Sequence, residues 1–277
     1  MKIVAASLIV VVVLALRVLP PLSADSVAPI YSGPTIGFPV GATSCPPTCY
    51  SYSWSGYQVS GPTGSVTDVK GSWKVPTYTG ALCNVNEWYF AAITVYIADS
   101  ITAENPGIAV ECYEGVVSYW AMTEFWTGTS GGYVQITSIT IHPGDVISAE
   151  VKYLGSAKFT ETVTDVSTKQ SYSKTATVTG AKETYGAWIV QPPNAGVGML
   201  PMADFGTVYW GSDNTGVSGT NYATVSGHTG PIGSFATVAS VESVCYPSGS
   251  PAKAVPSALS TDKSSFSVQW FNLGPEG

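Results

Sequence analysis

Most of the chain consists of short runs in which apolar and polar residues alternate, separated by turn residues. YVQITSITI (133–141) is followed by the turn HPGD (142–145), and the pattern returns in FATVASVESVCY (235–246) and SFSVQWF (265–271). Successive side chains of a strand point to opposite faces, so each run predicts a strand with one buried face. Many such strands at short spacing, with no long helical period, predict an all-β fold. We expect one antiparallel two-sheet β-sandwich domain over residues 50–277.

The first 49 residues differ in composition and in hydrophobic pattern from the rest of the chain. Met1 and Lys2 precede an apolar run at 3–16, and small residues follow near Ala24, which is typical of a secretory signal peptide over residues 1–24. The run is short for a membrane span, although a retained N-terminal anchor is the alternative. Residues 25–49 are rich in Pro, Gly and Ser and predict an extended N-terminal arm. We therefore expect a secreted, extracellular protein, or one attached to the cell surface.

The chain carries few charges, since only 10% of its residues are Asp, Glu, Lys or Arg, against roughly 25% in ordinary globular proteins. Loss of residues 1–24 would remove Lys2 and the single arginine, Arg17, and shift the net charge from −7 to −9. An acidic chain without arginine is a poor partner for nucleic acid. Few ionisable groups also suit an acidic medium, because little charge changes as the pH falls. We expect a monomer whose mature form does not bind membranes.

Cysteine and histidine usage limits the chemistry. Five cysteines in an exported chain predict one or two disulfides, and Cys45 and Cys49 are close enough to pair locally, but the sequence does not choose among the pairings. The two histidines, His142 and His228, both lie in turn-like segments. Without a Cys-x-x-Cys pair or a histidine cluster, we expect no metal and no cofactor. GTSGG (128–132) matches a hydrolase motif, but no helix is predicted after it, so it predicts a hairpin loop.

Acid–base chemistry, if present, should therefore depend on carboxylates or amides. The candidates are Glu111 and Glu114 in IAVECYEG, Glu124 in the aromatic run YWAMTEFW, and Gln191 in GAWIVQPP. Each follows or interrupts an apolar run. From the residues alone, Glu111 could equally be a solvent-facing residue of an alternating strand.

Five segments, in order, resemble motifs of the glutamic peptidase (eqolisin) family of secreted acid endopeptidases. Each motif is weak alone, but together they span most of the mature chain. The segments are SWSGY (53–57), VKGSWKVP (69–76), YWAMTEFW (119–126), ITIHPGDVISAEV (139–151), and GAWIVQPP (186–193) with LPMADFGTVYW (200–210).

The resemblance implies a sandwich whose concave face holds a polypeptide substrate. The family's catalytic pair is a glutamine and a glutamate from neighbouring strands that act on one water. This chain departs from the pattern at both positions, because Glu111 stands where the family has the glutamine and Gln191 where it has the glutamate. An exchanged pair could still activate a shared water. In an alternative alignment Val110 takes the glutamine's place, with Glu114 further on, and the pair is then broken.

The remaining site residues also follow from the resemblance. Glu124 matches a glutamate that borders the catalytic pair, where it would orient the pair by hydrogen bonding. Trp88, Trp120, Met122 and Trp126 match substrate-contacting positions, and core packing is the alternative for all four. We expect a secreted acid endopeptidase that hydrolyses peptide bonds by general-base activation of a water held between Glu111 and Gln191. The alternative is a catalytically inactive peptidase-like sandwich that serves as a cell-surface binding or structural module.

Overall fold

The computed structural model describes residues 48–80, 83–84, 88–128, 130–193, 199–245 and 251–273. The expected signal peptide and the expected arm, as far as residue 47, lie outside the described residues. The first described strand, β1 (Thr48–Ser51), begins two residues before the expected boundary of the domain and pairs in parallel with β17 (Ala239–Val244).

The prediction of an all-β fold is confirmed. Strands dominate the described residues, where the helical pieces are the one-turn helix α1 (Ser212–Thr215) and a 3-10 turn at Ile232–Ser234. The expected strand at 133–141 is β9 (Val134–Thr140), and the one at 265–271 is β19 (Phe266–Trp270). The alternating run at 235–246 is a strand only over β17, because a bend at Phe235 and a turn at residues 236–237 occupy its start.

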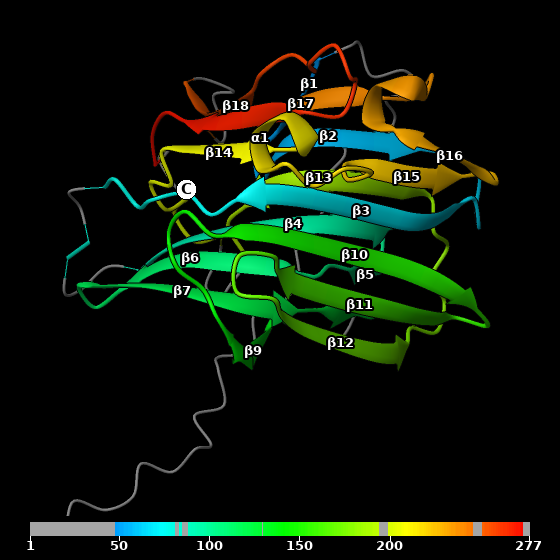
Figure 1. Cartoon of the computed structure of the whole chain (residues 1–277), viewed down its shortest axis with the longest axis horizontal. Coiled ribbons are helices and arrows are strands. Elements are labelled where there is room, and N and C mark those ends of the chain that lie inside the picture. The colour runs from blue at the N-terminus through cyan, green and yellow to red at the C-terminus, as the bar shows by residue number, and fades with distance from the viewer. Residues whose placement is uncertain are drawn as a thin grey trace, which may run out of the picture.

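The strands form two layers. The first layer runs across the front of Figure 1, and its neighbouring strands are mostly antiparallel. It consists of β12 (Gln170–Thr177), β11 (Lys158–Asp165), β10 (Val146–Gly155) and β3 (Val66–Lys74), continued by β15 (Tyr222–Val225), β16 (His228–Pro231) and β14 (Thr207–Trp210).

The second layer lies behind the first. Its pairing order is β2 (Ser55–Ser60), β13 (Tyr185–Gln191), β4 (Trp88–Ala98), β6 (Gly107–Tyr113), β7 (Val116–Thr123) and β9, and the short strands β5 (Ala103–Glu104) and β8 (Phe125–Trp126) extend β4 on one side. At one end the layers are joined through β17, β18 (Ala252–Pro256) and β19.

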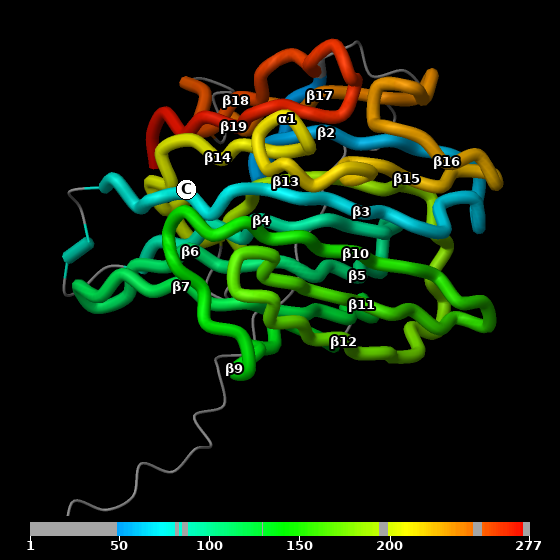
Figure 2. The backbone as a smooth tube through the Cα atoms, viewed as in Figure 1, coloured from blue at the N-terminus to red at the C-terminus, as the bar shows by residue number. Residues whose placement is uncertain are grey.

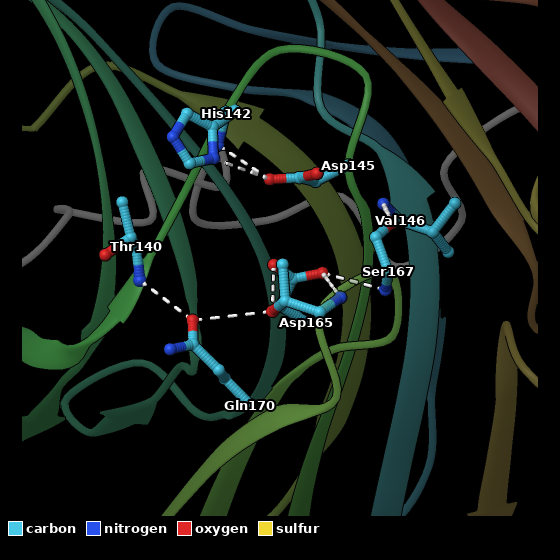
Figure 3. A network of polar contacts seen from close by, with 8 residues as sticks. Thr140, His142, Asp145, Val146, Asp165, Ser167 and Gln170 are labelled. Atoms are coloured by element: carbon cyan, nitrogen blue, oxygen red, sulfur yellow. Dashed lines mark hydrogen bonds and ion pairs between the residues drawn. The ribbon is translucent and has the colours of Figure 1, made fainter.

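The other end of the sandwich is almost closed. Here β9 of the second layer lies beside β12 of the first (Figure 2). The backbone N–H of Thr140 donates to Oε1 of Gln170, 3.2 Å away, across this seam (Figure 3). The strands thus form a single hydrogen-bonded network that folds back on itself as a flattened barrel.

The two layers enclose one large apolar core. Trp73 and Phe159 of the first layer meet Ile93, Val110 and Trp188 of the second layer there, and all five are completely buried. Burial of this much apolar surface is the dominant stabilising contribution to a domain of this size. The second layer has an opposite face, on which Phe90 and Ala92 of β4 begin a separate apolar cluster. It corresponds to the face that the family resemblance predicts to be concave, and we call it the concave face.

Hydroxyl groups cover the outer face of β11 and β12. Three cross-strand pairs are linked by hydrogen bonds between their side-chain oxygens, at 2.7 to 3.1 Å, and together they form a ladder along the exposed surface. The pairs are Thr160–Thr175, Thr162–Ser173 and Thr164–Ser171. Such pairs each contribute a few tenths of a kcal/mol, up to about 1 kcal/mol, to sheet stability.

A disulfide joins Cys83 to Cys112, so the segment just before β4 is tied to β6. Cys49 is also disulfide-bonded. The prediction of disulfides is therefore confirmed. Among the described residues, no helix has the length and apolar character needed to cross a membrane.

We expect the variant Cys83→Ser/Cys112→Ala to lose about 3–4 kcal/mol in free energy of unfolding, because the bond closes a loop with a sequence separation of 29 residues. Urea unfolding at equilibrium, under oxidising conditions, measures the difference. An unfolding free energy equal to that of the wild type would show that the bond adds nothing to stability.

Candidate active site

Four neighbouring strands of the second layer bring the candidate residues onto one face. The register aligns Gln191 of β13 with Ala92 of β4, Ala92 with Ala109 of β6, and Ala109 with Trp120 of β7. Partners in a sheet row point to the same side. Glu111 lies two residues from Ala109 and so faces the same way. This is the concave face of the second layer.

The Glu111 carboxylate is half-buried and is held by three donors. Trp88 Nε1 donates to Oε1 at 2.7 Å, and Trp120 Nε1 donates to Oε2 at 3.0 Å. The Ser118 hydroxyl donates to Oε2 at 3.3 Å. All three groups donate, and an ionised carboxylate only accepts. The two indoles therefore fix the orientation of a carboxylate that solvent can still reach.

Gln191 lies at the end of β13 and is completely buried. Its Nε2 donates to the hydroxyl oxygens of Tyr96 and of Tyr133, the latter at 2.7 Å. Its Oε1 has no hydrogen-bond partner among the described residues. Burial raises the pKa of both tyrosines far above the ordinary range, with a contribution from nearby Glu124, so both remain neutral phenols.

Glu111 and Gln191 share a face but no polar contact among the described residues. They stand two strands apart and one row apart, which separates their Cα atoms by about 12 Å. Phe90 is the β4 residue paired with Glu111, and its ring packs against Trp120 and Tyr133 between the two polar side chains. Each of the two side chains is held by its own set of partners.

The register also places residues that the sequence left ambiguous. Ala109, not Glu111, shares a row with Gln191 across the small residue Ala92. Val110, the alternative, points into the core between the layers, and Glu114 is exposed in the β6–β7 turn. The sequence alone could not show that Ala109 lies in the same row as Gln191, because the row depends on how the strands pair.

Glu124 is completely buried where β7 gives way to β8. Asn105 Nδ2 donates to its Oε2 at 2.6 Å, while its backbone N–H donates to Glu161 Oε2 at 3.1 Å. Burial raises the pKa of the Glu124 carboxyl to about 8, only partly offset by the Asn105 hydrogen bond. The described contacts do not join it to Glu111 or Gln191, and its influence on the site runs through the field that it exerts on Tyr96 and Tyr133.

The four candidate substrate-contacting residues fall into two groups. Trp88 and Trp120 contact Glu111 directly. Met122 is completely buried in the concave-face cluster with Tyr133 and Leu200, and half-buried Trp126 packs against the neighbouring cluster around Trp54 and Tyr96. The two tyrosines that hold Gln191 were not predicted. Tyr96 lies on the Ala92 face of β4, so the strand's alternation was a usable signal, whereas nothing in the sequence pointed to Tyr133.

Two other segments that the sequence singled out, the turn at His142 and the GTSGG run, lie in loops of the structure. His142 is exposed in the β9–β10 turn, and its backbone N–H donates to Asp145 at 2.7 Å (Figure 3). The described residues of the GTSGG segment lie in a loop in which the Thr127 N–H donates to the Ser130 carbonyl oxygen. The flanking strands β8 and β9 pair with β5 and β7 and not with each other, so the loop is not the predicted hairpin. Within the described part of the chain, no group of three His, Cys, Asp or Glu side chains could hold a metal ion.

Comparison with known proteins agrees with the two-layer fold. The model of the peptidase A4 family matches residues 52–242, and the chain belongs to that family. The resemblance to glutamic peptidases is thus confirmed. Among curated proteins, none matches the chain.

Solved structures of the same kind match over nearly their whole length. Aspergilloglutamic peptidase from Aspergillus niger is 30% identical, with a TM-score of 0.52, and the match covers 66% of this chain and 99% of that one. Scytalido-glutamic peptidase, solved with a transition state analog inhibitor, has a TM-score of 0.62 at 17% identity, covering 79% of this chain and 98% of that one. At 17% identity, the second likeness shows the fold alone.

Proposed function

We propose that the chain is a secreted acid endopeptidase that binds an extended polypeptide on the concave face and hydrolyses it with Glu111 as general base. The single observation that carries the proposal is the half-buried Glu111 carboxylate held between the indoles of Trp88 and Trp120 on that face. Membership of the peptidase A4 family supports the reaction class. The Cys83–Cys112 disulfide is consistent with export to an oxidising compartment.

In this mechanism, Glu111 takes a proton from a water as the water oxygen attacks the scissile carbonyl carbon and the carbonyl π electrons move onto its oxygen. When this tetrahedral intermediate collapses, the C–N bond breaks and the proton passes from Glu111 to the leaving amine nitrogen. General-base assistance needs a positioned, ionised acceptor within hydrogen-bond reach of the water. Trp88 and Trp120 hold the acceptor in place, and the half-buried Trp88 also offers a flat surface to the substrate. Gln191 takes the amide-donor role of the pair, and Glu124 acts on the site only through Tyr96 and Tyr133, whose hydroxyl groups hold Gln191. For Gln191 to address the same water as Glu111, the Phe90 ring between them must move when substrate binds.

A second candidate is polypeptide binding without hydrolysis. Glu111 and Gln191 favour it, because each is hydrogen-bonded to its own partners and, among the described residues, the two side chains do not contact each other. Ala109 favours it too, because the methyl group in the row of Gln191 cannot hold a water. This candidate corresponds to the inactive module considered above.

Digestion of denatured casein across about pH 2–7, with pepstatin present to silence contaminating aspartic peptidases, tests the proposal. We expect cleavage in acid. The same peptides should be measured for binding by fluorescence anisotropy at each pH. Binding without cleavage over the whole range would replace the proposal with the second candidate, and the absence of both would contradict the two of them.

Secretion predicts a shortened N-terminus. We expect secreted material to begin near Asp25, because the small residues before it suit signal-peptide cleavage. N-terminal sequencing of the protein from culture medium measures this directly. Recovery of chains that begin at Met1 in a membrane fraction would favour the retained anchor.

A further inference from the structure

Three glutamates meet in the interior at the end of the sandwich where β5 and β8 lie. Glu104 belongs to β5 and Glu161 to β11, and in the sheet register both share their face with residues of the core between the layers. Glu124 lies between β7 and β8, and its backbone N–H donates to Glu161. All three side chains are completely buried. Because Glu161 comes from the first layer and the other two from the second, the cluster spans the layers.

In the described part of the chain, no basic side chain forms an ion pair with these three carboxyl groups. Its salt bridges are His142–Asp145 and Lys152–Asp68, both elsewhere. Lys174 is paired with Glu161 in the sheet, but its ammonium group lies over the ring of Phe125, 5.9 Å from the centroid, and forms no ion pair within the described residues.

Several oxygens of the cluster also lack hydrogen-bond partners among the described residues. They are both carboxyl oxygens of Glu104, Oε1 of Glu124, Oε1 of Glu161 and Oδ1 of neighbouring Asn105. A buried carboxylate without partners is very costly, whereas a neutral carboxyl costs far less and can donate a hydrogen bond. The described residues offer no metal-binding group that could compensate the charge instead.

The other titratable groups that face the cluster are acids and phenols. Asp99 at the end of β4 and Glu183 before β13 act on Glu104, and Tyr96 and Tyr133 interact with Glu124. Burial first, and repulsion among the acids second, raise the pKa of Glu104 and of Glu161 well above the ordinary range. Burial alone raises the pKa of Glu124 to about 8.

We propose that Glu104, Glu124 and Glu161 form a pH-sensitive lock that holds the two layers together while the carboxyls are protonated and opens as they ionise. In the unfolded chain these groups ionise near pH 4.3. Their raised pKa in the folded state means that the unfolded state loses protons first as the pH rises. Stability is therefore full below about pH 4 and falls through the interval up to about pH 8.

The three-glutamate lock lies next to the candidate active site, but the proposal does not depend on whether that site hydrolyses peptides. Glu124 acts on Tyr96 and Tyr133, which hold Gln191, so ionisation would disturb the floor of the concave face as well as the core. The device would confine the folded protein to acidic surroundings whether or not it hydrolyses peptides. Its test accordingly needs no activity measurement.

The experiment is thermal unfolding of the full chain between about pH 4 and pH 8, for the wild type and for Glu104→Gln/Glu124→Gln/Glu161→Gln. The wild-type midpoint should fall by about 10 °C or more across the range. The triple variant, in which neutral amides replace the three acids, should flatten this fall. Glu114→Gln, the same substitution at an exposed position in the β6–β7 turn, is the matched control and should keep the wild-type slope.

A wild-type midpoint that stays level or rises with pH would overturn the proposal, as would a triple variant with the wild-type slope. If the triple variant does not fold, the infrared carbonyl band of protonated carboxyl groups decides the matter in the folded wild type at about pH 6. We expect this band to be present, and to weaken in the single variant Glu161→Gln. Its absence from the folded wild type would equally overturn the proposal.

Discussion

Glu111→Gln should reduce peptide hydrolysis in acid by about 10²–10⁴-fold, the usual loss when a general base is removed. The amide keeps the shape of the side chain but cannot take a proton from water. The amide nitrogen cannot accept from an indole N–H, so one of the two tryptophan hydrogen bonds is lost and the thermal midpoint should fall by a few degrees while the fold is kept. Initial rates on denatured casein at the wild-type optimum measure the effect.

The matched control for this variant is again Glu114→Gln, three residues further along the chain in the exposed β6–β7 turn. It removes the same charge from the same end of β6 without touching the two indoles that hold Glu111. It should cleave at the wild-type rate. Equal rates for the wild type and Glu111→Gln would remove Glu111 from the site.

The double exchange Glu111→Gln/Gln191→Glu should remain as inactive as Glu111→Gln alone. From the sequence, the exchange restores the family's arrangement and should preserve activity if both positions address one water. The structure sets different surroundings for the two positions, however. A carboxyl at position 191 would be completely buried beside two phenols and near Glu124. Burial of this kind raises the pKa of a carboxyl, so in acid it would be protonated and unable to act as a base.

The double variant should be measured beside Gln191→Glu alone, because the single change separates the effect of the new acid from the loss of Glu111. Recovery of activity in the double variant, above the level of Glu111→Gln, would show that positions 111 and 191 act on a common water after all. It would also require the Phe90 ring to move aside in the working enzyme.

The fold could be predicted from the sequence where one face of a strand is exposed to solvent and the other is buried. The alternating run YVQITSITI predicted β9 because most side chains of this strand are in solvent, although the strand's two buried residues, Ile136 and Ile139, are three positions apart rather than two. WYFAAITVYIA, which forms β4, carries no such alternation because it is buried on both faces, by the core on one side and by the concave-face clusters on the other. The sequence therefore predicted the class of fold better than the position of its central strand.

The site could be predicted as far as residue types and faces. Glu111 and Gln191 do lie on one face, since a strand's alternation decides the face. The row within that face depends on how strands pair, and a shift of two residues preserves the face while moving a side chain about 7 Å along the strand. The burial of Glu161 could be predicted from its strand, because Glu161 alternates with Phe159 and Val163, both of which are buried.

The hydroxyl ladder on β11 and β12 has a consequence for a protein whose surroundings change in pH. Threonine and serine hydroxyls neither gain nor lose protons anywhere in the physiological range, so these three cross-strand bonds are the same in acid and at neutrality. Lysine–glutamate pairs in the same places would lose their attraction once the glutamates were protonated. These three links between β11 and β12 therefore hold whatever the pH, in contrast to the Lys152–Asp68 salt bridge on the neighbouring strands and to the glutamates enclosed behind the layer.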